Sequence, residues 1–251
     1  MLKALGRWKR REAARPRLPD GLRVYAIADV HGCKKQMVQL LEAIEHDRTG
    51  FSGTTHLVFL GDLIDRGPDS SGVLEHVLTA ELPADEVTFL MGNHEEFMLD
   101  CYEGKTERYA QWLRFGGIET MKSYGVSREQ IFSKGFDLSA AMKLAVPPGH
   151  LAFMRSFQDT LRLGDYLFAH AGIRPGTKLE DQSPKDLRWI TTEFLTDETD
   201  HGFTVVHGHT IGPEIMRQSN RIGIDTGCYK SGVLTALILE GDETSSIATD
   251  R

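Results

Sequence analysis

Between residues 22 and 102 the chain alternates short apolar runs with segments of helical periodicity, and this alternation restricts its possible folds more than any other feature. The apolar runs, rich in Val, Ile, Leu and Phe as buried strands are, lie at residues 22–29, 56–61 and 87–91. The segments with helical spacing lie at residues 34–47, 71–80 and 95–102. Strands that alternate with helices predict a layered α/β protein.

The second half of the chain predicts strands of a different kind. Residues 160–163 and 166–169 flank a Gly164-Asp165 turn, which is typical of an antiparallel hairpin. Further short strands are expected at residues 204–207, 221–225 and 233–239. Because the first half favours parallel pairing and the hairpin is antiparallel, we expect mixed sheets.

A helical, polar-aromatic stretch at about residues 101–158 interrupts the strand series. It is either a cap that shapes access to the substrate or a plain helical insertion that packs over the core, and the sequence favours neither. With 251 residues, we expect one domain at residues 21–251 that contains this insertion.

Side chains that bind metals follow five of the expected strands. The segments are Asp29-Val30-His31-Gly32, Gly61-Asp62, Gly92-Asn93-His94, His170-Ala171-Gly172 and Gly208-His209. Ligands in α/β proteins collect at the carboxyl ends of strands. Asp29 and His31 are two residues apart, so on an extended chain both side chains point to the same side. We therefore expect the five segments to build one site.

The six candidate donors are of three chemical types. They are two carboxylates, three imidazoles and one amide, on Asp29, Asp62, His31, His170, His209 and Asn93. A set with imidazole but no thiolate suits Mn, Fe or Zn better than Ca or Mg. Six donors exceed the needs of one tetrahedral ion, and a carboxylate can bridge two ions, so the sequence predicts two divalent cations.

These segments, together with Asp65-Arg66-Gly67 and Glu95, resemble the motifs of the calcineurin-like metallophosphoesterases. Within them the chain is similar to the phosphoprotein phosphatase superfamily, on its bacterial branch of Ser/Thr phosphatase-like enzymes and symmetrical diadenosine tetraphosphatases. The likeness runs from about residue 22 to residue 241. It implies a layered fold of mixed central sheets, a β-sandwich flanked by helices, with a helical cap insertion.

The resemblance also implies a division of roles. Asp29, His31 and Asp62 would hold one metal, while Asp62, Asn93, His170 and His209 would hold the other, with Mn²⁺ expected and Fe or Zn as alternatives. A hydroxide activated by both metals would attack phosphorus. The resemblance makes His94 the acid that protonates the leaving oxygen, with Asp65 orienting its ring and favouring its cationic form. Arg66 would bind two phosphate oxygens.

Two further residues are weaker candidates for substrate binding. Relatives usually carry a second arginine in a pattern like Trp-Ile-Arg, where this chain has Trp189-Ile190-Thr191. Arg188 either substitutes for it or is an ordinary surface arginine. His207 is a ligand, a hydrogen-bond partner of a ligand or a buried strand residue, of which we favour the second.

Three functions remain open from the sequence. The first is a phosphomonoesterase of the Ser/Thr protein phosphatase type, acting on a phosphorylated protein, a peptide or a small phosphate ester. The second is a symmetrical bis(5'-nucleosyl)-tetraphosphatase, for which Trp112, Phe115 and Tyr124 would supply base stacking if the insertion overhangs the site. The third, disfavoured because a binder needs no leaving-group acid, is a non-catalytic binding module.

The charge of the chain is segregated. Seven basic residues against Glu12 give the first 17 residues a net charge of +6, which leaves −13 for the remainder of a chain whose total is −7. Residues 1–20 are therefore expected to form a basic, flexible tail, with contact to an anionic membrane as an alternative. The acidic remainder argues against a stable nucleic-acid partner. Without an apolar span or a paired cysteine pattern, we expect a cytoplasmic protein.

Overall fold

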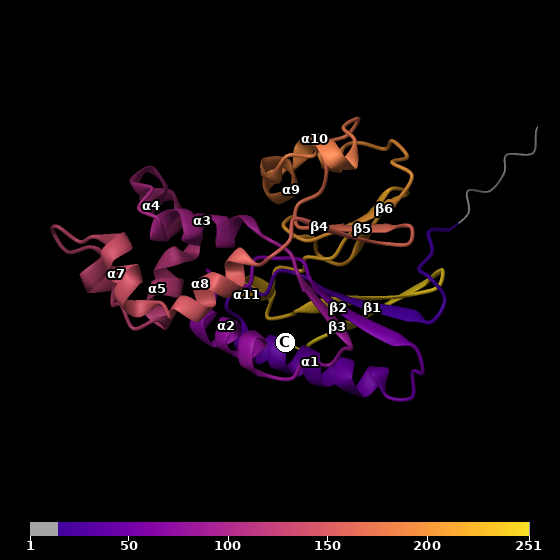
Figure 1. Cartoon of the computed structure of the whole chain (residues 1–251), viewed down its shortest axis with the longest axis horizontal. Coiled ribbons are helices and arrows are strands. Elements are labelled where there is room, and N and C mark those ends of the chain that lie inside the picture. The colour runs from indigo at the N-terminus through magenta and orange to yellow at the C-terminus, as the bar shows by residue number, and fades with distance from the viewer. Residues whose placement is uncertain (1–14, 251) are drawn as a thin grey trace, which may run out of the picture.

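The computed structural model describes residues 15–250, which form two five-stranded sheets (Figure 1). The first sheet has the order β10-β9-β1-β2-β3, and its strands are β1 Leu22–Ile27, β2 Thr54–Phe59, β3 Glu86–Phe89, β9 Thr235–Glu240 and β10 Glu243–Ala248. The second sheet has the order β4-β5-β6-β8-β7, and its strands are β4 Thr160–Leu163, β5 Tyr166–Ala169, β6 Thr204–His207, β7 Met216–Arg217 and β8 Arg221–Gly223.

Both sheets are mixed, which confirms the predicted fold class. In the first sheet β1, β2 and β3 are parallel, while β9 runs antiparallel to β1. In the second sheet β5, β6 and β8 are parallel, while β4 pairs with β5 as the predicted antiparallel hairpin. The sequence did not predict β10, because this edge strand is mostly polar and exposed and so lacks an apolar pattern.

Alternate side chains of each strand enter different cores. On β1, Val24 and Ala26 point into an apolar core that also contains Tyr166 and Phe168 of β5, so this core lies between the two sheets. Tyr25 belongs to a second core that contains residues of α1 and α2. The other face of the second sheet packs on α9 and α10 through a third core. The layers are therefore helix, sheet, sheet and helix, the sandwich that the resemblance implied.

The helices fall into three groups along the chain. Those that cover the first sheet are α1 Lys34–Arg48 and α2 Ser70–Thr79. A lobe at one end of the molecule contains α3 Asn93–Tyr102, α4 Thr106–Trp112, the π-helical turn η1 Leu113–Gly117, α5 Ile118–Ser123, α6 Arg128–Ile131, α7 Leu138–Ala145 and α8 Pro148–Arg155. The remaining elements are η2 Leu179–Asp181, α9 Pro184–Trp189, α10 Thr192–Leu195 and α11 Cys228–Ser231.

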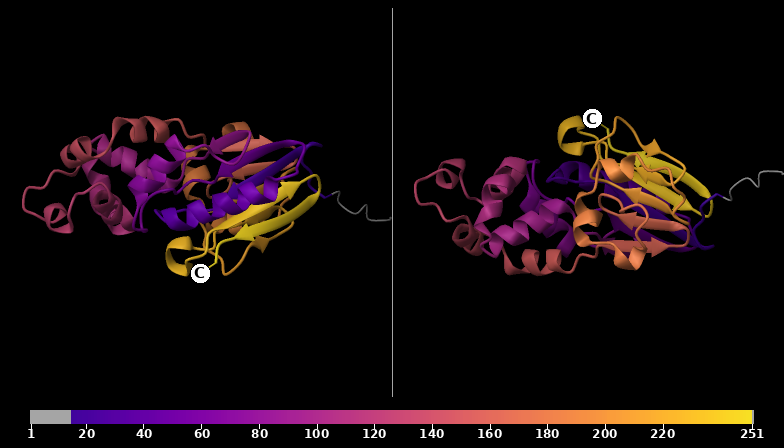
Figure 2. Two further views of the ribbon diagram at one scale, coloured as in Figure 1. Left: turned by 90° about the horizontal axis from the view of Figure 1, so that it is seen from below. Right: turned by 90° about the horizontal axis from the view of Figure 1, so that it is seen from above.

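The helical lobe extends the molecule away from the sheets, as both views of Figure 2 show. Its buried residues, among them Trp112, Met142 and Met154, join the same core as α1 and α2. The lobe includes the predicted insertion at about residues 101–158. It is thus packed as part of the body, and its contribution to the site comes from specific contacts described below.

The predicted tail ends earlier along the chain than expected. Leu18 is 1% exposed in the core between the sheets, and its N–H donates to the carbonyl of Gly241. The backbone of Arg17 exchanges hydrogen bonds with Asp165, and Tyr166 donates its hydroxyl proton to the carbonyl of Pro16. Residues 16–18 therefore belong to the folded body, whereas most of the basic tail lies outside the described residues. Among residues 15–250, no helix has the length and apolar character that crossing a membrane requires.

Candidate metal centre

The site lies where the carboxyl ends of strands from the two sheets meet. Asp29 and His31 follow β1, Asp62 follows β2, and Asn93 follows β3 as the first residue of α3. From the second sheet, His170 follows β5 and His209 follows β6. Because these strands are parallel within each sheet, their ends lie at one edge, and the sandwich brings the two edges together.

The backbone is bent unusually at these strand ends. Within residues 15–250, five non-glycine residues have positive φ angles, and all five were predicted as site residues: His31, Asp62, Asp65, Arg66 and His209. Such a conformation costs free energy for a residue with a Cβ atom and is concentrated at functional sites. The bends lie in three separate segments that all contribute side chains to the site.

The carboxylate of Asp62 lies at the centre of the site. Its Oδ2 atom lies 3.7 Å from His31 Nε2, 3.8 Å from His94 Nε2 and 3.5 Å from His170 Nε2. Two groups of possible ligand atoms therefore share this carboxylate: His31, Asp62 and His94 form one, and Asp62, His170 and His209 form the other. The position of Asp62 fits the bridging role that the resemblance implied.

The imidazoles are oriented as metal ligands are. His31 Nδ1 lies 2.8 Å from the carbonyl oxygen of Ile64, and His170 Nδ1 lies 2.8 Å from that of Leu60. A carbonyl only accepts, so each Nδ1 donates and each Nε2 presents a lone pair. Nε2 of His31 is buried and has no hydrogen-bond partner within residues 15–250. A bound cation would satisfy this atom, so the donors fit a metal.

The other predicted ligands surround the same point. Asp29 accepts hydrogen bonds from the backbone N–H of His209, and its Oδ2 lies 3.9 Å from His31 Nε2. Asn93 Oδ1 lies 3.0 Å from His170 Nε2. Burial raises the pKa of Asp29 and of Asp62 well above the ordinary range, and nearby carboxylates raise both further. A divalent cation would reverse this cost by pairing with the buried carboxylates.

His94 and Asp65 form a buried hydrogen-bonded pair beside Arg66. Nη2 of Arg66 lies 3.1 Å from His94 Nε2, so this nitrogen accepts and Nδ1 donates to Asp65 Oδ2 at 2.7 Å. Burial and the charge of Arg66 lower the pKa of His94 to about 3. The imidazole of His94 is therefore neutral at neutral pH in this arrangement, and the expectation that Asp65 favours its cationic form stays a prediction.

The helical lobe contacts Asp65 through two residues and Arg66 through a third. Asp65 accepts hydrogen bonds from Trp112 Nε1 at 2.9 Å and from the Thr120 hydroxyl at 2.5 Å. These donors partly offset burial, which raises the pKa of Asp65 to about 7. The N–H of Arg66 donates to the carbonyl of Gly116 in the π-helical turn. The lobe therefore fixes the backbone and side chains of the predicted catalytic residues.

Two of the three aromatic residues considered for base stacking have other roles. Trp112 is 0% exposed and contacts Asp65. The hydroxyl of Tyr124 lies 2.7 Å from Nδ1 of His150 on α8, and Nε2 of the same ring lies 3.0 Å from Glu75 on α2. Only Phe115, which is 37% exposed and directly precedes the Gly116 contact with Arg66, remains able to meet a base.

Glu95 is a site residue whose role the sequence did not reveal. Its carboxylate is fully buried and accepts hydrogen bonds from the N–H groups of Asp62, Leu63 and Gly92. It therefore holds the bend that carries the bridging carboxylate. The position of Glu95, three residues after Gly92 at a helix start, is a capping-box signal that could have indicated backbone contacts.

Tyr229 on α11 is a second residue that the sequence did not reveal. Its hydroxyl accepts from Nη1 of Arg66 at 3.1 Å, and the guanidinium carbon of Arg66 lies 4.8 Å from its ring centroid. The ring also meets His31 edge to face, with centroids 5.2 Å apart. Arg66 is thus held between Tyr229 and His94. Nothing in the local sequence links Tyr229 to residues so distant along the chain.

Arg188 and His207, the weaker candidates, are engaged elsewhere. Nε of Arg188 donates to Asp159 at 2.7 Å, and its Nη1 lies 3.4 Å from Glu96. His207 is 1% exposed, and its ring packs edge to face on Phe194. Burial lowers its pKa to about 4, so it is a neutral core histidine at neutral pH. Both side chains are therefore engaged within the fold, and their roles in substrate binding stay predictions.

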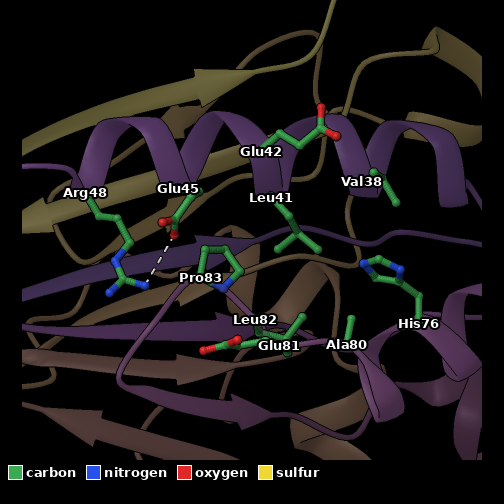
Figure 3. Close-up of a pocket in the computed structure, with 10 residues that line it drawn as sticks. All are labelled: Val38, Leu41, Glu42, Glu45, Arg48, His76, Ala80, Glu81, Leu82 and Pro83. Atoms are coloured by element: carbon green, nitrogen blue, oxygen red, sulfur yellow. Dashed lines mark hydrogen bonds and ion pairs between the residues drawn. The ribbon is translucent and has the colours of Figure 1, made fainter.

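A groove lies between α1 and the segment that follows α2 (Figure 3). It has a volume of about 500 Å³, and Leu41 and Leu82 lie in it among the acidic residues Glu42, Glu45 and Glu81. None of its lining residues belongs to the metal-ligand set. The groove is therefore separate from the candidate metal centre.

Comparisons with known proteins agree with this geometry. Residues 22–230 match the model of the calcineurin-like phosphoesterase family. A symmetrical bis(5'-nucleosyl)-tetraphosphatase from Methylobacillus flagellatus is 27% identical over 86% of this chain and 92% of its own length. A zinc-dependent endopolyphosphatase from Saccharomyces cerevisiae is 26% identical over 86% of this chain and 75% of its own length. An asymmetrical bis(5'-nucleosyl)-tetraphosphatase from Bacillus subtilis is 28% identical, with coverages of 88% and 92%.

Solved structures share the fold. A crystal structure assigned provisionally as a diadenosine tetraphosphatase superimposes with a TM-score of 0.62 at 21% identity, covering 91% of this chain and 94% of the other. A cold-active protein-tyrosine phosphatase of a Shewanella species gives a TM-score of 0.52 at 18% identity, with coverages of 93% and 83%. At these identities the likeness concerns the fold alone.

Proposed function

We propose that this chain, which belongs to the calcineurin-like phosphoesterase family of hydrolases, cleaves a phosphoanhydride bond in a dinucleoside polyphosphate such as diadenosine tetraphosphate. The observation that carries the proposal is the pair of ligand groups that share Asp62. This arrangement suits two divalent cations, and such pairs assist in-line displacement at phosphorus.

The curated relatives direct the choice of substrate. Two of them are named as tetraphosphatases of dinucleosides and one as an endopolyphosphatase. These substrates share linked phosphates. We therefore place the polyphosphate hydrolase, the second function open from the sequence, ahead of the phosphomonoesterase. Phe115, exposed beside the turn that contacts Arg66, offers a surface on which a base can stack.

Asp29, His31, Asp62, Asn93, His170 and His209 would hold the cations. When bound, the pair would neutralise phosphate charge and lower the pKa of water, and Mn²⁺ suits these donors while Zn²⁺ is the metal named for one relative. The residues that hold the cations come from both sheets. The sandwich must therefore be intact for both sites to exist.

Arg66 and His94 act on the phosphate chain in turn. In the structure Nη2 of Arg66 donates to His94 Nε2. A bound phosphate attracts the guanidinium more strongly than a neutral imidazole does, so substrate binding would free Nε2 to hold a proton near the leaving oxygen. Asp65 keeps the ring in place through Nδ1. Water attack forms a new P–O bond and gives up a proton to solvent, while the bridging P–O bond breaks and the leaving phosphate takes its electron pair; Nε2, protonated from solvent, can pass its proton to the leaving oxygen.

The test uses metal-stripped protein reconstituted with Mn²⁺ and three substrates: p-nitrophenyl phosphate, a phosphothreonine peptide and diadenosine tetraphosphate. We expect the highest kcat/KM for the dinucleotide. Chromatography of the products tells two molecules of ADP from ATP plus AMP, and so a symmetrical from an asymmetrical cut. Preference for the peptide would instead support the phosphomonoesterase. An Asp62→Asn variant that retains two metals and full turnover would disprove the proposed centre.

A further inference from the structure

The candidate site contains one arginine that faces the metal ligands, Arg66, while a substrate with linked phosphates carries several negative charges. Position 191, where a second arginine was expected, is a threonine. Arg188 is held by Asp159 and Glu96. Linked phosphates that extend beyond the metal ions and Arg66 would therefore gain from a further cation.

Lys230 on α11 is placed to be that cation. Its Nζ atom lies 5.2 Å from the ring centroid of Tyr229, the same ring that the guanidinium of Arg66 approaches to 4.8 Å. The separation of the two charges is therefore no greater than the sum of these two distances. A short chain of linked phosphates can span such a separation.

The charge of Lys230 is also available to a ligand. The residue is exposed, and it forms no ion pair within 4.0 Å in the part of the chain that the structure describes. The ring of its neighbour Tyr229 meets the ligand His31 edge to face, with centroids 5.2 Å apart. The ammonium group thus stands beside a ring that contacts the site rather than on a remote surface.

We propose that Lys230 is the second phosphate-binding side chain of this site. Arg66 and Lys230, which both contact the ring of Tyr229, would bind neighbouring phosphates of a polyphosphate chain. The inference deepens the proposed function and rests on it for the nature of the natural substrate. It makes Lys230 a specificity residue: its ammonium contributes to binding only when the ligand has a phosphate beyond the one that Arg66 holds.

Calorimetric titration of the Mn²⁺-loaded protein tests this without any turnover. The probes are inorganic phosphate and imidodiphosphate, a pyrophosphate whose bridging oxygen is replaced by NH. We expect Lys230→Gln to raise the Kd for imidodiphosphate about tenfold, as loss of one charge-assisted phosphate contact would. The same variant should change the Kd for inorganic phosphate less than twofold, and Lys230→Arg should stay close to the wild type.

Lys178→Gln is the matched control, because it removes one exposed lysine charge from the loop before α9. An equal weakening by Lys178→Gln would show a general effect of net charge and overturn the proposal. So would a Lys230→Gln variant that weakens both probes alike or neither. Because no hydrolysis is measured, a protein that fails to cleave diadenosine tetraphosphate would refute the proposed function while these titrations still decide the role of Lys230.

Discussion

Replacement of Thr120 by valine tests whether the helical lobe supports the predicted catalytic pair. Thr120 is fully buried, and its hydroxyl donates to Asp65 Oδ1 at 2.5 Å. Valine keeps the shape and removes the donor. The hydroxyl also lies 3.0 Å from the N–H of Asp65 and 2.9 Å from Ser70 Oγ, but that N–H retains Ser70 Oγ as an acceptor at 2.9 Å, so the carboxylate bears the main loss.

The expected cost is that of one buried hydrogen bond to a charged group, about 2–3 kcal/mol. For a chain of this size, this lowers the Tm by roughly 5–10 °C. Thr120→Ser is the control, because it keeps the hydroxyl and loses only a methyl group, at about 1 kcal/mol. Thermal unfolding of metal-stripped protein at pH 8 measures both variants.

The difference between the two variants should depend on pH with a defined sign. The pKa of Asp65 is raised to about 7, and the Thr120 donor favours the charged form. The stabilising effect of the hydroxyl is therefore largest above pH 7 and shrinks when Asp65 is protonated at pH 5.5. Loss of the donor raises this pKa further, so the valine variant should also lose turnover near pH 7 and recover as the pH rises. Equal Tm values for the valine and serine variants at pH 8 would refute the reasoning. So would a difference in Tm between the two variants that is the same at pH 8 and pH 5.5.

Three further substitutions test other residues of the site. His94→Asn should lower kcat for a phosphothreonine peptide about 10²–10⁴-fold. It should lower kcat for diadenosine tetraphosphate much less, because a phosphate leaving group needs little protonation. Stopped assays on both substrates measure this, and equal losses would exclude His94 as the acid. Arg188→Gln should leave the KM for the dinucleotide unchanged and alter stability by about 1 kcal/mol or less, since its ion pairs are partly exposed; a large rise in KM would restore it as a phosphate ligand. In the wild type the His207 ring, with its pKa lowered to about 4, stays neutral in the fold while the unfolded chain binds a proton, so the free energy of unfolding falls between about pH 6.5 and pH 4. His207→Gln should make this fall smaller. An unchanged pH dependence in denaturant melts would contradict the burial of a neutral ring.

The sequence predicted the parts of the site that depend on local pattern. Asp29, His31 and Asp62 stand directly after apolar runs, so the rule that ligands gather at strand ends was enough to bring them together. The two sheets, the hairpin and the principal helices followed from the same periodicities. The start of α3 was missed by two residues, because Asn93 and His94 are polar and buried and therefore interrupt an apolar pattern.

The parts that were missed depend on contacts between distant residues. Trp112 was considered for base stacking, but it donates to a carboxylate 47 positions earlier. Tyr229 contacts Arg66 across 163 positions. No periodicity encodes such pairs, because each residue alone has the composition of an ordinary core or surface position. A buried carboxylate such as Asp65 requires donors, but the sequence does not say which helix supplies them.

The hydrogen bonds from the helical lobe to Asp65 and the contact of Gly116 with Arg66 limit how substrate preference can be redesigned. Replacing all of residues 101–158 with the segment of a relative would also remove the hydrogen-bond donors that hold Asp65. The turnover of such a chimera would fall, and a change in substrate preference could not be separated from this loss. Grafts that keep Trp112, Gly116, Thr120 and the buried Val126 and Ile131, and vary only Phe115 and the exposed residues between 125 and 137, would separate the two properties. The lobe is therefore best treated as two parts, a fixed inner side and an outer side that is open to exchange.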